Sequence, residues 1–144
     1  MRKHESHVAE SLGRAHGALL KDLRALQEAA CSASNRNPEL LRSRLEATRR
    51  HIVEHFRFEE QDGYMDTVRH REPRLGHSID ELAREHGQLL NEMDVLLTEV
   101  AAALSINETL STKVSEWINH VRQHETRENH LVQDAFNLDI GLED

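Results

Sequence analysis

The stretch HIVEHFRFEE, residues 51–60, repeats a metal-ligating type of side chain at every fourth position: His51, His55 and Glu59. Positions four apart lie on one face of an α-helix, so the stretch predicts a helix with two imidazoles and a carboxylate along one side. Phenylalanines stand among these residues. The pattern therefore raises the question of whether this polar face meets solvent or points into the interior of a helical protein.

The composition favours a single helical domain. The 144-residue chain contains only two prolines and six glycines, and its aromatic content is 3%. Leu, Ala, Glu and Arg, which are strong helix formers, are abundant. A chain of this length has room for one hydrophobic core. We expect an all-α protein with one domain over residues 1–144.

Several function classes are disfavoured by simple features of the sequence. The formal net charge of −8 argues against nucleic-acid binding, which calls for a basic face. No apolar run is long enough to span a membrane, and no secretory signal is visible. The lone cysteine, Cys31, cannot form an internal disulfide. We therefore expect a cytoplasmic protein. Its 11 histidines need an explanation, because histidine is the commonest metal ligand.

Three breaks divide the chain into four predicted helices. Asn37 is placed to cap the second helix, Ser78 and Glu81 fit a capping box for the third, and Asn107 is placed to cap the fourth. The predicted helices cover residues 5–31, 38–70, 78–104 and 108–136, followed by an acidic tail at 137–144. Short connections make consecutive helices antiparallel, so we predict an up-down-up-down antiparallel four-helix bundle.

Ligand-type residues interrupt the apolar side of every predicted helix, where apolar residues recur at steps of three and four. The two halves of the chain repeat this pattern, since RAHGALLKDL at 14–23 parallels REHGQLLNEM at 84–93. A His-x-x-x-Glu pair follows each of these segments at a nearly equal interval. The interrupting residues are His16, His55, Glu59, His86, His124 and Glu128.

These residues are also predicted to lie at one level of the bundle. At 1.5 Å per residue, His16 and His55 both stand roughly 22–26 Å from the first turn, and the other two histidines fall at a similar depth. Burying carboxylates without partners costs several kcal/mol each, and a pair of metal ions bridged by the two carboxylates removes that cost. Nitrogen and oxygen ligands without thiolate suit iron or manganese, and zinc can also bind them.

The same residues resemble the hemerythrin-like HHE cation-binding domain family over nearly the whole chain. The resemblance rests on His16 in RAHGALL, His55 and Glu59 in HFRFEEQDGYM, His86 in REHGQLL, and His124 and Glu128 in HETREN. It implies a non-haem centre of two iron ions, oxo- or hydroxo-bridged, in which Glu59 and Glu128 are the bridging carboxylates. It also implies an open iron position that can meet O₂.

The chain departs from the hemerythrin pattern at one position. Hemerythrins carry a second histidine four residues before the third-helix ligand, whereas Leu82 stands four residues before His86 here. This difference puts reversible oxygen carriage in doubt and calls for other histidines as additional ligands. The candidates are His51, His120 and His77.

A rival assignment exists on the fourth helix, where His120 and Glu125 reproduce the spacing of oxygen-carrying hemerythrins. We prefer His124 and Glu128, because the internal repeat and the apolar spacing both point to them. We expect no separate catalytic residue. The residues predicted to support the ligands by hydrogen bonds are Glu60, Glu125 and Tyr64.

The metal-ligand pattern, together with what the resemblance implies, favours a metal- and oxygen-binding protein over a dedicated enzyme. We expect a di-iron protein that binds O₂ or a related small oxidant, for oxygen or redox sensing, storage or stress defence. Two alternatives stay open at this point. One is a di-iron peroxidase or nitric oxide reductase, and the other is a zinc-bound or metal-free helical interaction module.

Overall fold

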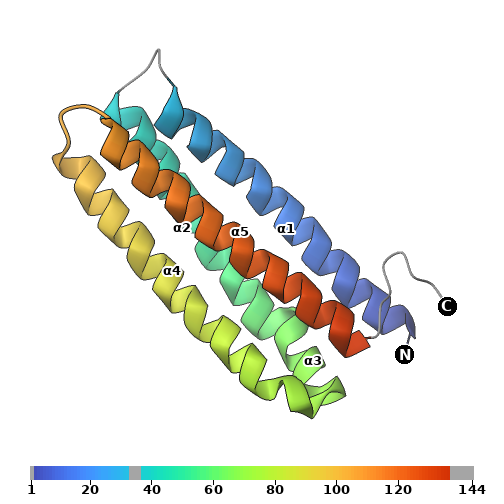
Figure 1. The fold of residues 1–144 in the computed structure, drawn as a ribbon. Helices are drawn as coiled ribbons and strands as arrows, with labels where there is room; N and C mark the ends of the chain where they lie inside the picture. Colours follow the sequence, from blue (N-terminus) through green and yellow to red (C-terminus); the bar gives the residue numbers. More distant parts are fainter. Residues whose placement is uncertain (1, 33–36, 137–144) are drawn as a thin grey trace.

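The computed structural model describes residues 2–32 and 37–136, and all regular structure within these residues is helical. The four long helices in Figure 1 are α1, α2, α4 and α5, and α3 continues the line of α2 at one end. In chain order the elements are α1 (Arg2–Cys31), α2 (Pro38–Arg57), the π-helix η1 (Phe58–Asp62), α3 (Tyr64–Arg71), the 3₁₀ turn η2 (Pro73–Leu75), α4 (Gly76–Ala102) and α5 (Glu108–Phe136).

The long helices enclose a shared interior. α1 contacts both α2 and α5, and α4 contacts the same two helices from the other side. The end of α1 lies beside the start of α5, where Ser111 Oγ donates to the Ala30 carbonyl at 2.5 Å and Gln27 Nε2 donates to Ser115 Oγ at 2.8 Å. The prediction of an all-helical bundle is confirmed.

Two predicted helix caps are present. The Asn37 side chain accepts a hydrogen bond from the Glu39 backbone N–H at 2.9 Å, and Pro38 occupies the first helical position of α2. At the start of α5, the Asn107 side chain accepts from the Leu110 backbone N–H at 2.8 Å. Such caps satisfy N–H groups that have no partner inside the helix.

The predicted capping box at the third long helix is wrong. η2 runs directly into α4, which begins at Gly76, so Ser78 already lies inside the helix. No side-chain cap bonds the start of α4, and the Gly76 backbone N–H bonds instead to the Pro73 carbonyl. The 3₁₀ turn thus supplies the acceptor that a capping side chain would otherwise provide.

The single helix predicted over 38–70 is also interrupted. α2 ends at Arg57, and the π-helix η1 and Gly63 separate it from α3. A Cβ atom added to Gly63 would stand 2.8 Å from the Phe58 carbonyl oxygen and 2.9 Å from Glu59 Cα. Only glycine permits this close approach of backbone to backbone. π-Turns inside helices are frequent at functional sites, and this one contains Glu59.

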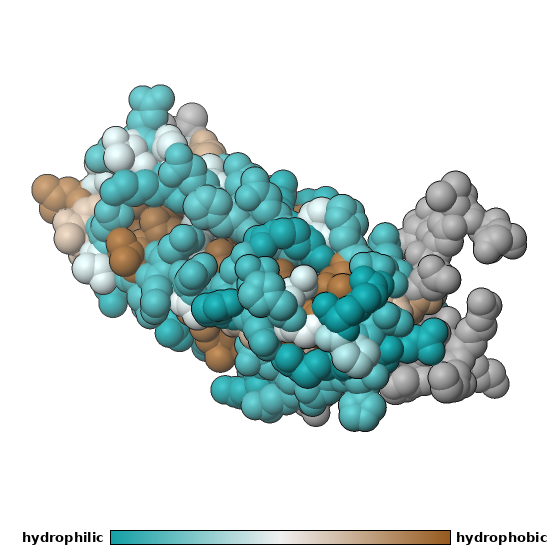
Figure 2. All heavy atoms as spheres, turned by 60° about the horizontal axis from the view of Figure 1, so that its bottom comes forward, coloured by the Kyte–Doolittle hydropathy of each residue, from teal (hydrophilic) through white to brown (hydrophobic). Residues whose placement is uncertain are grey.

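The hydrophobic core consists of two clusters separated along the helices by a polar layer. The order is clear along α5, where Val121 belongs to one cluster, His124 and Glu128 follow, and Leu131 belongs to the other cluster. Figure 2 shows a face of the molecule that is mostly hydrophilic, with small hydrophobic areas between the polar residues. Among the residues that the structure describes, no helix has the length and apolar character needed to cross a membrane.

Candidate metal centre

The polar layer brings together the six residues that interrupt the apolar sides of the helices. All six are buried, and Glu59, His124 and Glu128 have no exposed surface. They come from every long helix and from the π-helix η1, which is called the π-turn below. His16 lies on α1, His55 on α2, Glu59 on η1, His86 on α4, and His124 and Glu128 on α5.

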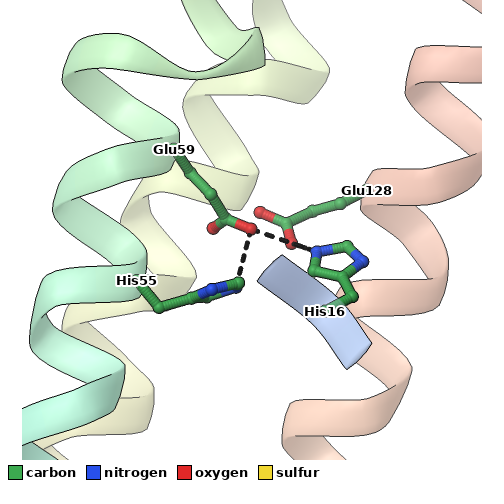
Figure 3. A group of neighbouring side chains, drawn as sticks. All are labelled: His16, His55, Glu59 and Glu128. Atoms are coloured by element: carbon green, nitrogen blue, oxygen red, sulfur yellow. Dashed lines mark hydrogen bonds and ion pairs between the residues drawn. The ribbon is translucent and has the colours of Figure 1, made fainter. Parts of the chain in front are cut away.

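Figure 3 shows the first of two groups, in which four side chains converge from α1, α2, η1 and α5. His16 Nε2 lies 3.2 Å from Glu59 Oε2 and 3.1 Å from Glu128 Oε1. His55 Nε2 lies 3.0 Å from the same Glu59 oxygen. Two imidazole nitrogens thus face one oxygen of each carboxylate.

The second group repeats this arrangement on the other side of the carboxylates. His86 Nε2 lies 3.0 Å from Glu59 Oε1 and 3.4 Å from Glu128 Oε2. His124 Nε2 lies 3.1 Å from that Glu128 oxygen. Glu59 and Glu128 therefore each present one oxygen to each pair of histidines, which is the arrangement required of two bridging carboxylates.

The interatomic distances fit a cation in each group. Ligand atoms about 2.0–2.2 Å from one ion and at right angles to each other stand about 3.0 Å apart, close to most of the distances above. In addition, His55 Nε2, His124 Nε2 and Glu59 Oε1 are buried without a hydrogen-bond partner in the described structure. Such atoms are rare in native proteins and call for an ion or water. The donor set fits a pair of metal ions.

Two of the histidines are oriented from outside the cluster. Glu60 Oε2 lies 2.5 Å from His86 Nδ1, and Glu85 Oε1 lies 2.7 Å from His124 Nδ1. An imidazole that donates through Nδ1 keeps the lone pair of Nε2 free for a metal. Glu60 therefore lies where the sequence analysis predicted.

Glu85 is a further carboxylate at the cluster, one that helical spacing does not predict. It is next to His86 in sequence, yet it contacts His124 on the neighbouring helix, and Arg127 Nη2 donates to its Oε1 at 2.7 Å. No periodicity within one helix reveals a contact of this kind between two helices. Its His124 contact and the Arg127 salt bridge place Glu85 as a second orienting carboxylate.

The remaining predicted supporting residues also lie at the cluster. Tyr64 is buried, and its hydroxyl donates to Glu128 Oε2 at 2.9 Å. Glu125 is buried as well, and its Oε2 stands 3.5 Å from His55 Nε2 without a hydrogen-bond partner in the described structure. Tyr64 thus has the predicted hydrogen-bonding position, whereas Glu125 does not hydrogen-bond to an imidazole.

The structure does not bring the three candidate additional histidine ligands into the cluster. All three are exposed and face acidic residues at the surface, because a position off the apolar side of a helix ends at the edge of the bundle. The contacts are His51 Nδ1 with Asp22 at 2.8 Å, His120 Nδ1 with Glu92 at 3.3 Å, and His77 Nε2 with Glu81 at 3.6 Å.

The cluster has a strong internal electrostatic balance. Burial lowers the pKa of His16, but hydrogen bonds with Glu128 and Glu59 outweigh it and raise that pKa to about 10. The pKa of His86 is raised to about 10 by the same two carboxylates, again against burial. Burial raises the pKa of Glu128, but the neighbouring imidazoles of His124, His16 and His86 hold it well below its usual value. Without cations, imidazolium protons supply the positive charge that the carboxylates require.

A family model with the description "Hemerythrin HHE cation binding domain" matches residues 7–136 of the sequence. Searches of curated proteins and of solved structures found no match. The matched region contains every residue of the cluster. The chain therefore belongs to the hemerythrin HHE cation-binding domain family.

Proposed function

We propose that this chain is a non-haem di-iron protein that binds O₂ or a related small oxidant, for oxygen or redox sensing, storage or stress defence. One observation carries the proposal: Glu59 and Glu128 each direct one oxygen to each of two histidine pairs. A carboxylate that faces two ligand groups in this way would hold two cations, one through each oxygen. Bound iron would supply one-electron and O₂ chemistry.

The donor set suits iron. Each group offers two imidazole nitrogens and two carboxylate oxygens, and neither includes a thiolate. Mixed nitrogen and oxygen ligands suit iron and manganese, although zinc also binds them. Cys31 is exposed and accepts a hydrogen bond from Gln27 Nε2 at 2.9 Å, so it lies away from the cluster.

Two surface cavities support access by a small molecule. One, of about 380 Å³, is lined by residues of α1 and α5 that include His16 and Glu125. The other, of about 910 Å³, is lined by residues of α1 and α2 that include His55. Both reach histidines of the first group, which is the side of the cluster that a small oxidant would approach.

Residues of the chain would hold the ligands in place and restrict water. Phe56 is buried and stacks on His86, with ring centroids 3.9 Å apart and planes 8° apart. This contact fixes the plane of the imidazole and covers one of its faces. Burial, and to a lesser extent the charge of Glu128, raise the pKa of Tyr64. Its hydroxyl therefore keeps its proton and can donate it to Glu128 in a hydrogen bond.

We further propose that the long helices run up-down-up-down and that the protein acts in the cytoplasm. The side-by-side ends of α1 and α5 and the neighbouring positions of α2 and α4 support the first proposal. The lone cysteine supports the second, because it suits a reducing compartment.

Iron loading followed by exposure to O₂ tests the proposed function. The protein reconstituted with ferrous iron under argon should bind iron and develop ligand-to-iron charge-transfer absorption when O₂ is added. Less than one iron per chain, or equal preference for zinc with no change on adding O₂, would favour the interaction module. Sustained turnover of peroxide or nitric oxide by the reduced protein would favour the enzyme alternative.

A further inference from the structure

The two ligand groups differ in their surroundings. In the second group, Glu60 contacts His86 Nδ1 and Glu85 contacts His124 Nδ1. In the first group, His16 Nδ1 is buried and has no partner among the described residues. The first group has a different additional neighbour, since Glu125 lies beside His55 and lines the same cavity as His16. A third carboxylate therefore accompanies the first group.

Glu125 is a buried carboxylate whose second oxygen is not used. Its residue surface is 7% exposed, and Oε2 has no hydrogen-bond partner within the described structure. Burying an ionised carboxylate in this way is strongly unfavourable unless a proton or a cation compensates its charge. A buried carboxylate with an unpartnered oxygen beside two imidazoles is therefore suited to bind a cation.

The distance between Glu125 and His55 fits two ligands of one ion. Their Oε2 and Nε2 atoms stand 3.5 Å apart. Two ligand atoms about 2.1 Å from a shared ion and 3.5 Å from each other subtend about 113° at that ion. This angle lies in the ordinary range for metal ligands, whereas the same 3.5 Å is long for a hydrogen bond.

The internal repeat places this carboxylate at the position that an apolar residue occupies in the other half of the chain. In each His-x-x-x-Glu pair the position directly after the histidine can be compared, and it is Phe56 after His55 and Glu125 after His124. Phe56 covers a face of His86 in the second group. Glu125, at the matching position, lines a cavity with His16 of the first group. The repeat thus places a hydrophobic wall beside one group and a carboxylate beside the other.

We propose that Glu125 is a terminal carboxylate ligand of the cation held by His16 and His55, so that the two metal positions are chemically inequivalent. This inference rests on the proposed di-iron function. The first position has two imidazoles, one oxygen from each bridging carboxylate, and Glu125. The second position has only the corresponding imidazoles and bridging oxygens from the six residues of the cluster. The cavity beside Glu125 makes the first position the one open to a small ligand.

Mössbauer spectroscopy of protein loaded with ⁵⁷Fe, combined with iron titration, tests the proposal. Wild-type protein should bind two irons and give two distinct quadrupole doublets. In Glu125→Ala one doublet should change while the other is kept, and the affinity for one iron should fall by roughly 100-fold, the upper end of the loss caused by changing residues that merely support ligands. Glu116→Ala is the matched control, because Glu116 is an exposed residue of the same helix and should leave both unchanged.

Glu125→Gln separates a ligand from a positioning residue and preserves the shape of the side chain if the alanine variant fails to fold. An amide oxygen is a poor metal ligand but a good hydrogen-bond partner. We expect Gln to behave like Ala. If Gln restores the wild-type doublets and affinities, or if Ala never changes them, Glu125 is not a ligand and the proposal is overturned. Wild-type protein that binds fewer than two irons would instead overturn the proposed function itself.

Discussion

At the scale of single residues, Glu59 and Glu128 are the two buried carboxylates around which the four histidines of the cluster gather. Each is fully buried and lies within hydrogen-bonding or ion-pair distance of three imidazoles. An isolated buried carboxylate is strongly unfavourable, so the two residues must be compensated by protons or by cations. This requirement connects the stability of the bundle to its proposed metal binding.

Removing a histidine from either group should lower iron binding. His55→Ala removes one ligand of the first group and His124→Ala one ligand of the second, so each variant should retain clearly less iron than wild type. His70→Ala is the control, because His70 is exposed on α3 and should retain the wild-type amount. Metal analysis after gel filtration measures the difference, and equal retention by all three variants would refute the site.

The cation-free protein should lose stability as the pH rises from about neutral. His16 and His86 have pKa values of about 10 in the folded protein and an ordinary value of 6.5. A raised folded-state pKa stabilises the fold fully below 6.5, and this stabilisation is lost as the pH rises through about 10. The lowered pKa of Glu128 contributes stability above its ordinary value of 4.5, and this contribution is lost as the pH falls below that value.

Denaturant unfolding of the cation-free protein across this range measures the effect. The free energy of unfolding should be highest between pH 4.5 and 6.5 and decline toward pH 10. Iron-loaded protein should show a weaker decline, because the cations replace the protons. A free energy that stays level or rises from pH 6.5 to 10 in the cation-free protein would contradict this electrostatic account.

Helix spacing predicted the six residues of the cluster, because residues three and four apart share a helix face and the two halves of the chain repeat. Their role as ligands stays a prediction. Spacing was less able to predict which carboxylates contact these histidines from other helices. Glu85 reaches His124 from another helix, and the position of Glu125 depends on how α5 is rotated against α1. Such contacts depend on packing between helices, which a single sequence does not specify.

At the scale of the elements, caps and periodicity predicted four long helices, but they did not predict the π-turn. The apolar spacing of residues 38–70 suits an uninterrupted helix, whereas η1 (Phe58–Asp62) and Gly63 divide it. A π-turn adds one residue to a helical turn, and that insertion is too small to stand out in a hydrophobic pattern. The signal in the sequence was Gly63, an unfavourable residue within a predicted helix.

Gly63→Ala should disturb the cluster through the backbone. The added Cβ would stand 2.8 Å from the Phe58 carbonyl oxygen and 2.9 Å from Glu59 Cα, so the turn that carries Glu59 must move. We expect a loss of about 1–3 kcal/mol in the free energy of unfolding, the usual range when an added methyl group forces the surrounding backbone to shift, together with weaker iron binding.

Gly13→Ala is the matched control for this change. A Cβ at Gly13 meets no atom within 4 Å, and alanine stabilises an exposed helix by up to about 1 kcal/mol relative to glycine. Chemical denaturation and iron titration of both variants provide the comparison. If Gly63→Ala matched Gly13→Ala in both measurements, the π-turn would have no role in placing Glu59.

At the scale of the whole molecule, the polar layer of six His and Glu residues connects all four long helices. It lies between the two hydrophobic clusters of the core. One apolar cluster contains Leu23, Met93 and Trp117, and the other contains Val68 and Ile79. The polar layer between them contributes little apolar burial. Bound cations would therefore stabilise the middle of the bundle, where the hydrophobic core is discontinuous.

Removal of iron should lower the stability of the entire fold, because the unfolded chain does not keep the ligands together. Binding at 100 times the dissociation constant contributes about 2.7 kcal/mol per site. Calorimetry should therefore give a higher Tm for iron-loaded protein, and the Tm should fall when a chelator removes the metal. An identical Tm with and without iron would show that the cluster does not hold cations in the folded state.

The most direct test of the central claim is a crystal structure of iron-loaded protein with anomalous diffraction measured at the iron absorption edge. The account predicts two iron peaks per chain. One should lie between His16 and His55, the other between His86 and His124, and both should contact Glu59 and Glu128. A single peak, or iron bound by other residues while these two carboxylates contact only protonated histidines, would contradict it.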